Sequence, residues 1–273
     1  MTRTENPANF LIEANELRST PTTHAPLLID TRPAAQYALG HLPGAINLST
    51  YDCFVPSTDV QGMLQFSREV AARYGAAGIT RERAVVLYEA QTGMRAARDQ
   101  WILEYCGHTG SRILHGGLAA WQAAGGTLTT QPPAIDPAGF VPALHPLGVI
   151  GLEELHVRLH DPALSIIDVR DATEFAGRDE TACCARRGHI PGAKWMEWTT
   201  FLTQGFFKPP AEIRGMLERE GITDTNEVAV YCHRGARSAN AYYALRRAGY
   251  GRVRNFIGSF HEWSARAEFP VEI

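Results

Sequence analysis

The chain contains 273 residues, a length that predicts two domains or one large domain. Hydrophobic residues make up 45% of it, and 26 Lys and Arg against 29 Asp and Glu give a net charge of −3. This composition excludes a disordered chain and argues against a nucleic-acid-binding protein. The apolar runs are too short to span a bilayer, and the first residues lack the pattern of a secretory signal. We therefore expect a cytoplasmic protein with no nucleic-acid or membrane partner, compatible with a monomer.

Taken in chain order, four segments of the first half return in the second half. Residues 27–32 (LLIDTR) return as 165–170 (SIIDVR), 40–45 (GHLPGA) as 188–193 (GHIPGA), 85–88 (VVLY) as 228–231 (VAVY), and 116–121 (GGLAAW), more loosely, as 258–263 (GSFHEW). Matched residues are 138, 148, 143 and 142 positions apart. Ordered matches at a nearly constant offset indicate a duplicated domain, with a period too long for a solenoid repeat.

A stretch between the two copies contains several proline and glycine residues. Residues 129–139 read TTQPPAIDPAG, and proline and glycine disfavour regular structure. We expect a linker from about residue 130 to about residue 146. The predicted domains are then residues 1–130 and residues 147–273.

Short apolar segments and helical patterns alternate within each copy. In the second copy, residues 165–169 and 227–232 predict buried strands. Residues 211–221 and 238–248 predict helices, each ended by a glycine. This alternation predicts an α/β fold in which each domain is a parallel sheet with helices on both faces. Ligands of such folds bind beyond the carboxyl ends of the strands.

The segment that follows the second of these strands contains the most reactive side chain of the sequence. Residues 232–238 read CHRGARS, so Cys232 stands between a strand and a helix, beside Arg234 and Arg237. Loop N–H groups, the helix dipole and these cations all favour the thiolate, which is the nucleophilic form of cysteine. The loop therefore predicts a nucleophilic cysteine that meets an anionic substrate. The alternative is a buried, inert cysteine.

The motifs Asp168-Val-Arg170, GHIPGA (188–193), YCHRGARS (231–238) and Gly258 to Trp263 together resemble the rhodanese family of thiosulfate and 3-mercaptopyruvate sulfurtransferases. The duplication resembles the tandem-domain members, and the resemblance covers nearly the whole chain. The resemblance also separates two loop types, because the phosphatase relatives of this family have a wider loop with the pattern Cys-x5-Arg. Here Arg237 lies five positions after Cys232, which favours the sulfurtransferase type over a phosphatase or arsenate reductase.

The resemblance implies a double displacement through a Cys232 persulfide. The outer sulfur of a small anionic donor such as thiosulfate passes to Cys232 and then to cyanide or a thiol. No metal and no organic cofactor are implied. Substrate contacts are expected from the loop residues His233, Arg234, Gly235, Ala236, Arg237 and Ser238. Support is expected from Asp168, Arg170 and Arg187. We interpret Asp168 and Arg170 as a scaffold ion pair, with contact to substrate as the alternative.

The first copy carries Glu89 at the position of Cys232. A carboxylate cannot carry a sulfane sulfur and repels an anionic substrate, so we expect the first copy to be inactive.

The choice of donor rests on the residues of the loop after Cys232. The mercaptopyruvate enzymes of the family resemble one another in a Cys-Gly-Ser-Gly loop, in which small residues follow the cysteine. Here His233 and Arg234 follow Cys232. We expect thiosulfate, with 3-mercaptopyruvate and a regulatory module without turnover as alternatives.

The second copy also contains an insertion near residues 177–187. Asp168 and His189 are 21 positions apart, but Asp30 and His41 only 11. The insertion contains Cys183 and Cys184, which could relay sulfur or oxidise. We favour two ordinary thiols, because no partner motif accompanies them. Cys53 and Cys106 are interpreted as inert thiols, and the two histidines as structural residues of the repeated turn.

Overall fold

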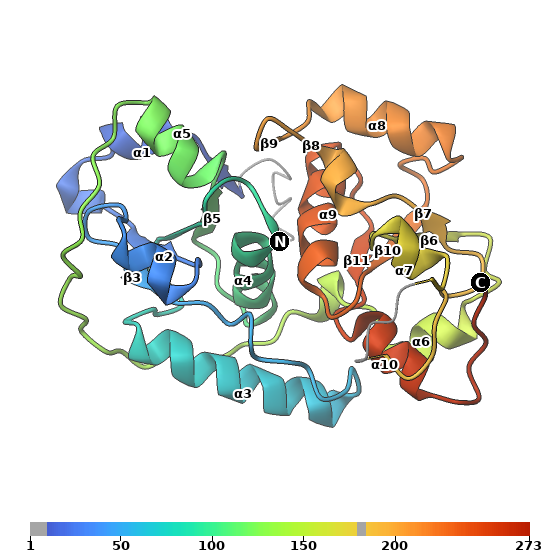
Figure 1. Cartoon of the computed structure of the whole chain (residues 1–273). Coiled ribbons are helices and arrows are strands. Elements are labelled where there is room, and N and C mark those ends of the chain that lie inside the picture. The colour runs from blue at the N-terminus through green and yellow to red at the C-terminus, as the bar shows by residue number, and fades with distance from the viewer. Residues whose placement is uncertain (1–9, 179–183) are drawn as a thin grey trace, which may run out of the picture. The chain divides into compact units, whose positions relative to one another are not determined.

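The computed structural model describes residues 10–178 and 184–273 (Figure 1). The chain divides into two compact units. Unit 1 contains the chain up to Cys53, Ser67–His145 and Gln204–Phe207, and unit 2 contains Phe54–Phe66, Pro146–Thr203 and Lys208–Ile273. Each unit therefore includes a segment from the opposite half of the sequence.

Unit 1 is built on a parallel sheet. Within the described residues its strands, in spatial order, are β1 (Leu11–Ile12), β5 (Ser111–Leu114), β4 (Val85–Tyr88), β2 (Leu27–Asp30) and β3 (Ile46–Asn47). All four residues of the central β4 are buried. Val86 and Tyr88 belong to one apolar cluster with Leu17, and alternate side chains of a strand point to opposite faces. Both faces of this sheet are therefore covered.

The helices of the first half follow the strands in alternation. They are α1 (Ala14–Ser19), α2 (Ala34–Ala38), α3 (Val60–Ala76), α4 (Met94–Tyr105), α5 (Gly117–Ala123) and the 3-10 turn η1 (Thr22–His24). Gly205 and Phe207 come from the second half of the sequence but form hydrogen bonds with residues of unit 1. The N–H of Thr92 donates to the carbonyl of Gly205 (2.9 Å), and the N–H of Phe207 donates to Nε2 of His115 (3.1 Å).

Unit 2 repeats the parallel sheet. Within the described residues its strands, in spatial order, are β11 (Val253–Asn255), β10 (Glu227–Tyr231), β6 (Leu164–Asp168) and β7 (Lys194–Trp195). In the register of β10 and β6, Tyr231 lies opposite Asp168. Tyr231 packs with Phe260 and Trp263 in one apolar cluster, while Val228 and Val230 point to the other face and are also buried.

The other elements of the second half of the sequence are α6 (Leu152–Val157), α7 (Ala172–Phe175), α8 (Pro210–Arg219), α9 (Ala236–Arg247), α10 (Ser259–Ala265), the 3-10 turns η2 (Pro146–Gly148) and η3 (Trp198–Phe201), and the short strands β8 (Leu202–Thr203) and β9 (Phe206–Phe207). All of them belong to unit 2 except β9, which belongs to unit 1. The strands and helices β6, β10, α8 and α9 lie where the sequence pattern predicts them. The predicted α/β fold with two parallel sheets is confirmed.

The segment Phe54–Phe66 comes from the first half of the sequence but belongs to unit 2. The N–H and Oγ1 of Thr58 donate to the two carboxylate oxygens of Glu262 (2.7 and 2.8 Å), and the N–H of Leu152 donates to Thr58 Oγ1 (2.8 Å). Thr58 thereby links the first turns of α6 and α10. Boundaries drawn from the sequence alone do not reveal this exchange of segments.

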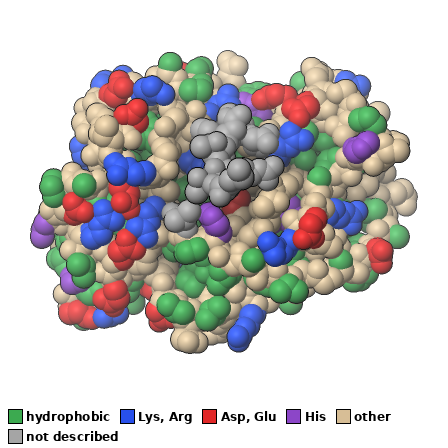
Figure 2. All heavy atoms as spheres, turned by 180° about the vertical axis from the view of Figure 1, so that it is seen from behind, with side chains coloured by type: hydrophobic (Ala, Val, Ile, Leu, Met, Phe, Trp, Pro, Cys, Tyr) green, Lys and Arg blue, Asp and Glu red, His purple; other side chains and the backbone are tan. Residues whose placement is uncertain are grey.

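Residues 131–145 form neither helix nor strand, as expected of a stretch rich in proline. In the described part of the chain, no helix is both long enough and apolar enough to cross a membrane. On the face shown in Figure 2, Lys and Arg side chains lie among Asp and Glu side chains, in keeping with a net charge close to zero.

Candidate active site

Cys232 directly follows the last residue of β10 and lies in a short loop that ends where α9 begins at Ala236. Its side chain is buried. Gly235 caps the helix with φ of 85°, and a Cβ there would lie 2.6–2.7 Å from atoms of Ile257. The tight turn therefore needs glycine at this position. It brings the N–H of Gly235 to 3.1 Å from Cys232 Sγ.

The surroundings of Cys232 favour its thiolate. Burial opposes ionisation, but the charge of Arg237 and hydrogen bonds from Ser238 and the backbone of Arg234 outweigh it, so the pKa of Cys232 lies below its ordinary value. Such an environment is typical of a nucleophilic cysteine. Burial instead raises the pKa of Cys53 and that of Cys106 to about 12, which supports the interpretation of both as inert.

Ser259 supports Cys232 from the first turn of α10. Its Oγ accepts a hydrogen bond from the N–H of Cys232 (3.2 Å) and lies 3.8 Å from Sγ. Ser259 has φ of 57°, a left-handed conformation that costs a residue other than glycine about 1–3 kcal/mol. Sequence reasoning missed this residue. The sequence did contain a signal, because Ser259 aligns with Gly117 of the first copy, and a glycine can mark a left-handed backbone. Gly117 also has φ of 57°.

Arg237 binds a carboxylate rather than projecting freely from the loop. Its two terminal nitrogens donate to the two oxygens of the buried Glu174 (2.5 and 2.9 Å), and Asp171 lies 3.4 Å away. Burial alone would raise the pKa of Glu174, but Arg237 holds it below its ordinary value. Arg237 thus acts on Cys232 through its charge, while two of its donors are already engaged.

Arg234 is held between two side chains of unit 2. Its guanidinium lies 4.3 Å from the centre of the Phe54 ring, and one nitrogen lies 3.4 Å from Nδ1 of His261. Phe54 and His261 were not singled out by sequence. Burial lowers the pKa of His233 to about 4, so this ring is neutral at pH 7. The full positive charge at the start of the loop therefore comes from Arg234.

Ser238 and Ala236 occupy the first turn of α9, and the Ser238 hydroxyl donates to Oδ1 of Asn255 (2.7 Å). Arg187 is exposed, in the part of the insertion that the structure describes. The neighbouring Arg186 donates to carbonyl oxygens at and just beyond the end of α10, including those of Phe269 and Arg266 (both 2.7 Å). Cys183 lies outside the described residues, and Cys184 is half-buried.

Asp168 and Arg170 form the scaffold ion pair that the sequence favours. Nε of Arg170 donates to Oδ1 of Asp168 (3.0 Å) and NH2 donates to Oδ2 (2.6 Å), with both side chains buried. The hydroxyl of Tyr231 also donates to Asp168 (2.6 Å), and Arg170 donates to the carbonyl of Gly188 (2.7 Å). The network ties the ends of β6 and β10 to the GHIPGA turn.

His189 and His41 have matching structural contacts. His189 stacks on Phe175, with ring centres 3.8 Å apart, and its Nδ1 contacts the Phe175 carbonyl (2.9 Å). His41 stacks on Tyr37 at 3.7 Å and contacts the Tyr37 carbonyl (3.0 Å). These contacts support a structural role for both.

In unit 1, the loop after β4 is occupied by the protein's own carboxylate. Oε1 of Glu89 accepts the N–H groups of Arg95 (2.8 Å) and Ala96 (2.9 Å), at the beginning of α4. Desolvation of this carboxyl raises the pKa of Glu89 to about 7. A Cβ at Gly93 would lie 2.7–2.8 Å from the carboxylate atoms. The N–H groups of Arg95 and Ala96 at the start of α4 are therefore bound by Glu89 and not offered to a substrate.

Comparison with known proteins follows the same division of the chain. The rhodanese-like domain model matches twice, over residues 13–124 and 151–266. A thiosulfate sulfurtransferase of Pseudomonas aeruginosa is 33% identical over 267 residues, covering 97% of each chain. A 3-mercaptopyruvate sulfurtransferase of Escherichia coli is 29% identical, covering 89% of this chain and 87% of its own.

Among solved structures, the anaerobic ergothioneine biosynthesis enzyme of Chlorobium limicola, in complex with trimethyl histidine, matches with a TM-score of 0.83 and 25% identity. The match covers 100% of this chain and 72% of that chain. The two family matches and the nearly full-length relatives show that this chain belongs to the rhodanese family, as a tandem of two rhodanese-like domains.

Proposed function

We propose that the chain is a thiosulfate sulfurtransferase whose nucleophile is Cys232. The observation that carries this proposal is the buried Cys232 sulfur, with the Gly235 N–H 3.1 Å away and a pKa below its ordinary value. The thiolate attacks the outer sulfur of thiosulfate, the S–S bond of the donor breaks, and sulfite leaves with the bonding electron pair. An acceptor, cyanide or a thiol, then attacks the persulfide sulfur and restores the thiolate.

The loop's own N–H groups stabilise the persulfide in this mechanism. A Cys232 persulfide carries negative charge on its outer sulfur, and N–H groups at the start of α9 face that charge together with the helix dipole. Ser259 fixes the backbone of Cys232 from the other side. Asp168 and Arg170 act as positioning residues, because the hydrogen bonds of their side chains within the described residues are with each other, Tyr231 and the Gly188 carbonyl.

Arg234 is the loop cation that we assign to the donor. Arg237 is already paired with Glu174 and His233 is neutral at pH 7, whereas the contacts of Arg234 within the described residues are with the π face of Phe54 and with His261, and neither is a carboxylate. The sulfonate of thiosulfate suits a guanidinium. A relative that is a 3-mercaptopyruvate sulfurtransferase makes mercaptopyruvate the second candidate donor.

A thiosulfate:cyanide assay tests the proposal. Purified protein should form thiocyanate, and incubation with thiosulfate alone should add the mass of one sulfur atom to the peptide that contains Cys232. Cys232→Ser should abolish both signals, while Cys106→Ser, at a buried thiol remote in sequence, should retain them. Absence of both thiocyanate and the mass change in the wild-type protein would leave a regulatory module without turnover as the better interpretation.

The donor is identified by comparing kcat/KM for thiosulfate and 3-mercaptopyruvate in the same preparation. We expect the ratio to favour thiosulfate, and Arg234→Gln to raise KM for thiosulfate more than it lowers kcat. A ratio that favours mercaptopyruvate would refute the donor assignment and leave the Cys232 mechanism intact.

We further propose that the protein acts in the cytoplasm on small molecules, without a metal or organic cofactor in the transfer step. The four described cysteines, Cys53, Cys106, Cys184 and Cys232, are free thiols, and a reducing compartment keeps such thiols reduced. Cell fractionation with an antibody against the protein checks this location.

A further inference from the structure

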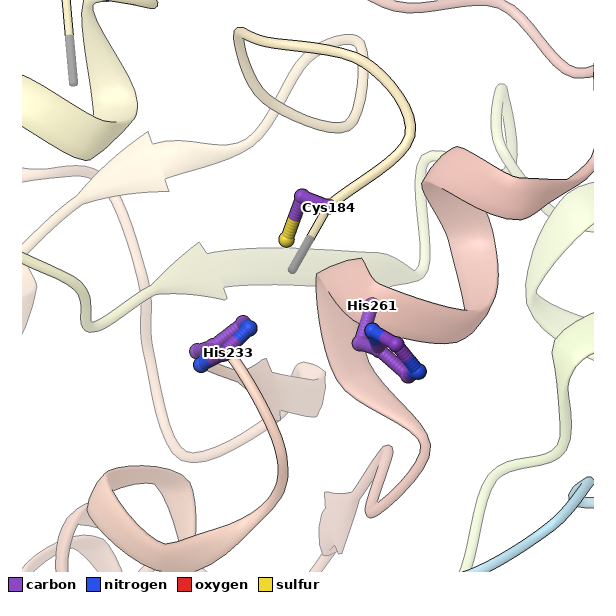
Figure 3. Close-up of side chains that lie close together, drawn as sticks. All are labelled: Cys184, His233 and His261. Atoms are coloured by element: carbon purple, nitrogen blue, oxygen red, sulfur yellow. The ribbon is translucent and has the colours of Figure 1, made fainter. Parts of the chain in front are cut away.

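Three potential metal ligands converge beside the active loop. One ligand atom from each of Cys184, His233 and His261 lies within 4.8 Å of the others. Figure 3 shows the three side chains close together. They come from three separate segments: the insertion, the loop after β10, and α10. Because the three residues are far apart in the sequence, they do not form a metal-binding motif with a short spacing. The sequence alone therefore gave no indication of a metal site.

The backbone holds the two histidines in place. The N–H of His261 donates to the carbonyl of His233 (3.1 Å), and the N–H of Phe260 donates to the carbonyl of Cys232 (3.0 Å). These bonds join the active loop to the first turn of α10. The two rings are perpendicular, with centres 6.1 Å apart. The pair is therefore arranged before any ligand arrives.

Cys184 is held to the same helix from its other end. Arg186, two residues later, donates to carbonyl oxygens of residues 263, 264, 266 and 269, at and beyond the end of α10. Cys184 also packs against the apolar cluster that contains Phe260 and Trp263. The described part of the insertion is thus tied to α10, and this places the thiol near both rings (Figure 3).

Thiolate and imidazole are both ligand types that Zn²⁺ takes, and a set of one thiolate and two imidazoles also suits copper. Tetrahedral coordination at normal Zn–N and Zn–S bond lengths separates the donor atoms by about 3.3–3.6 Å. Movements of about 1 Å at the ends of these side chains bring the three atoms to that spacing. Three protein ligands leave a fourth position for water or a small anion.

The duplication provides an internal comparison. The positions of His233 and His261 in the first copy are Ala90 and Ala119, and the insertion that contains Cys184 has no counterpart there. A second set of ligands at the equivalent place is therefore absent from the sequence. The cluster occurs together with the nucleophile, in the copy that carries Cys232.

We propose that Cys184, His233 and His261 bind a thiophilic divalent cation, with Zn²⁺ as the representative ion, next to the nucleophilic loop. On binding, the Cys184 thiol gives its proton to solvent and the sulfur forms a bond to the metal, while each imidazole donates one lone pair. No oxidation is involved. The site does not depend on sulfur transfer, so it can be tested even where the proposed activity fails.

The proximity of Arg234 gives the site a further property. Its guanidinium lies 3.4 Å from Nδ1 of His261, so a bound cation meets a like charge. We expect Arg234→Gln to tighten Zn²⁺ binding about tenfold, the change produced by about 1.4 kcal/mol. Unchanged or weaker binding in this variant would contradict the placement of the ion beside His261.

Cobalt is the probe, because Co²⁺ takes the same ligands as Zn²⁺ and is coloured. The reduced, metal-free full-length protein is titrated with Co²⁺ at neutral pH. One equivalent should produce a thiolate-to-cobalt charge-transfer band with the visible bands of tetrahedral cobalt, and Zn²⁺ should remove them. Cys184→Ser should eliminate the charge-transfer band, and His261→Gln should weaken binding by about tenfold or more.

Three control variants test whether the band arises from these three ligands. Cys183→Ser, at the adjacent cysteine, and Cys232→Ser, at the nucleophile, should both keep the band. His160→Gln, at an exposed histidine, should bind as the wild type does. Circular dichroism establishes that each variant is folded. A band that survives in Cys184→Ser, or disappears in Cys232→Ser or Cys183→Ser, would overturn the proposal.

Discussion

The loops that follow β4 and β10 are built on the same scaffold but hold different groups. In unit 1 the carboxylate of Glu89 accepts the N–H groups of Arg95 and Ala96, whereas in unit 2 the Cys232 sulfur lies against the N–H of Gly235. The unit 1 loop is also one residue longer, because α4 begins five positions after Glu89 and α9 begins four after Cys232. An internal anion in one copy thus occupies the place that the other copy keeps for a reactive sulfur.

The buried ion pairs behind these loops are nearly identical. Arg32 donates to Asp30 at 3.0 and 2.6 Å and to the Gly40 carbonyl at 2.7 Å. Arg170 makes the same three contacts, at the same distances, to Asp168 and Gly188. Because unit 1 has this network without a nucleophile, we interpret the network as one that stabilises the fold. The chemical difference between the copies lies in the loop and in the residues that contact it.

The largest effect is expected from breaking the shared network. Asp168→Asn leaves the buried Arg170 without a counter-charge, and removal of one partner of a buried ion pair costs about 3–5 kcal/mol. Asp30→Asn should have a similar effect in unit 1. Urea unfolding followed by fluorescence measures both. If only Asp168→Asn were destabilising, the two networks would not be equivalent and Asp168 would have a further role.

A smaller effect is expected at the left-handed position of α10. Ser259→Ala keeps the backbone strain and leaves the buried N–H of Cys232 without its acceptor, which costs about 1–3 kcal/mol. Ser259→Gly loses the same hydrogen bond but relieves the strain, so it should be less destabilising. Thermal unfolding of the two variants tests this order, and equal losses would show that the strain is negligible.

The equivalent position in unit 1 supplies the matched variant. A Cβ at Gly117 would lie 2.4 Å from the Glu89 carbonyl oxygen. Gly117→Ser should therefore destabilise the protein, although serine is the native residue at this place in unit 2. A neutral result would contradict the close approach of the Glu89 backbone to the first turn of α5.

The Glu89 carboxyl should produce a pH dependence that is confined to unit 1. Its pKa is about 7 in the folded chain against an ordinary value of 4.5, so the folded state binds the proton more tightly. Its contribution to stability is full below about pH 4.5 and is lost as the pH rises through about 7. Glu89→Gln cannot ionise, and its stability relative to wild type should increase over this window by at most about 1.4 kcal/mol per pH unit.

Urea unfolding of wild type and Glu89→Gln at pH 5 and pH 8 checks this expectation. Glu82→Gln, at an exposed glutamate, is the control and should show no such difference between the two pH values. A Glu89→Gln difference that stays constant with pH would mean that Glu89 is not protonated near neutrality.

The smallest effect concerns the reactivity of Cys232 and comes from the charge of Arg237, apart from the loss of stability that follows when the buried Glu174 loses its partner. Arg237→Gln removes the cation that favours the Cys232 thiolate, so alkylation of Cys232 by iodoacetamide at pH 7 should slow by a few-fold, up to about tenfold for one pKa unit. Mass spectrometry of the Cys232 peptide gives the rate. Arg95→Gln changes the matching residue in unit 1, whose guanidinium lies 4.0 Å from the centre of the Tyr51 ring, and should leave the rate unchanged.

Features defined by short segments could be predicted from the sequence. The duplication, the central strands and the loop around Cys232 each lie within a few consecutive residues, and comparison of the two copies identified Glu89. The pairing of Arg237 with Glu174 joins residues 63 positions apart, and a loop motif alone cannot show which carboxylate reaches it. The contact of Phe54 with Arg234 could not be predicted because repeat matching assigns Phe54 to the other copy.

The segment Phe54–Phe66 has a consequence for any attempt to cut the gene in two. A gene that encodes only residues 147–273 specifies the cysteine and its loop, but it omits the aromatic face under Arg234 and the threonine that joins α6 to α10. The half that carries Glu89 in place of the nucleophile is therefore still needed to complete the other half. Although the two halves of the sequence are similar, we expect that the second half cannot form the complete site when it is produced alone.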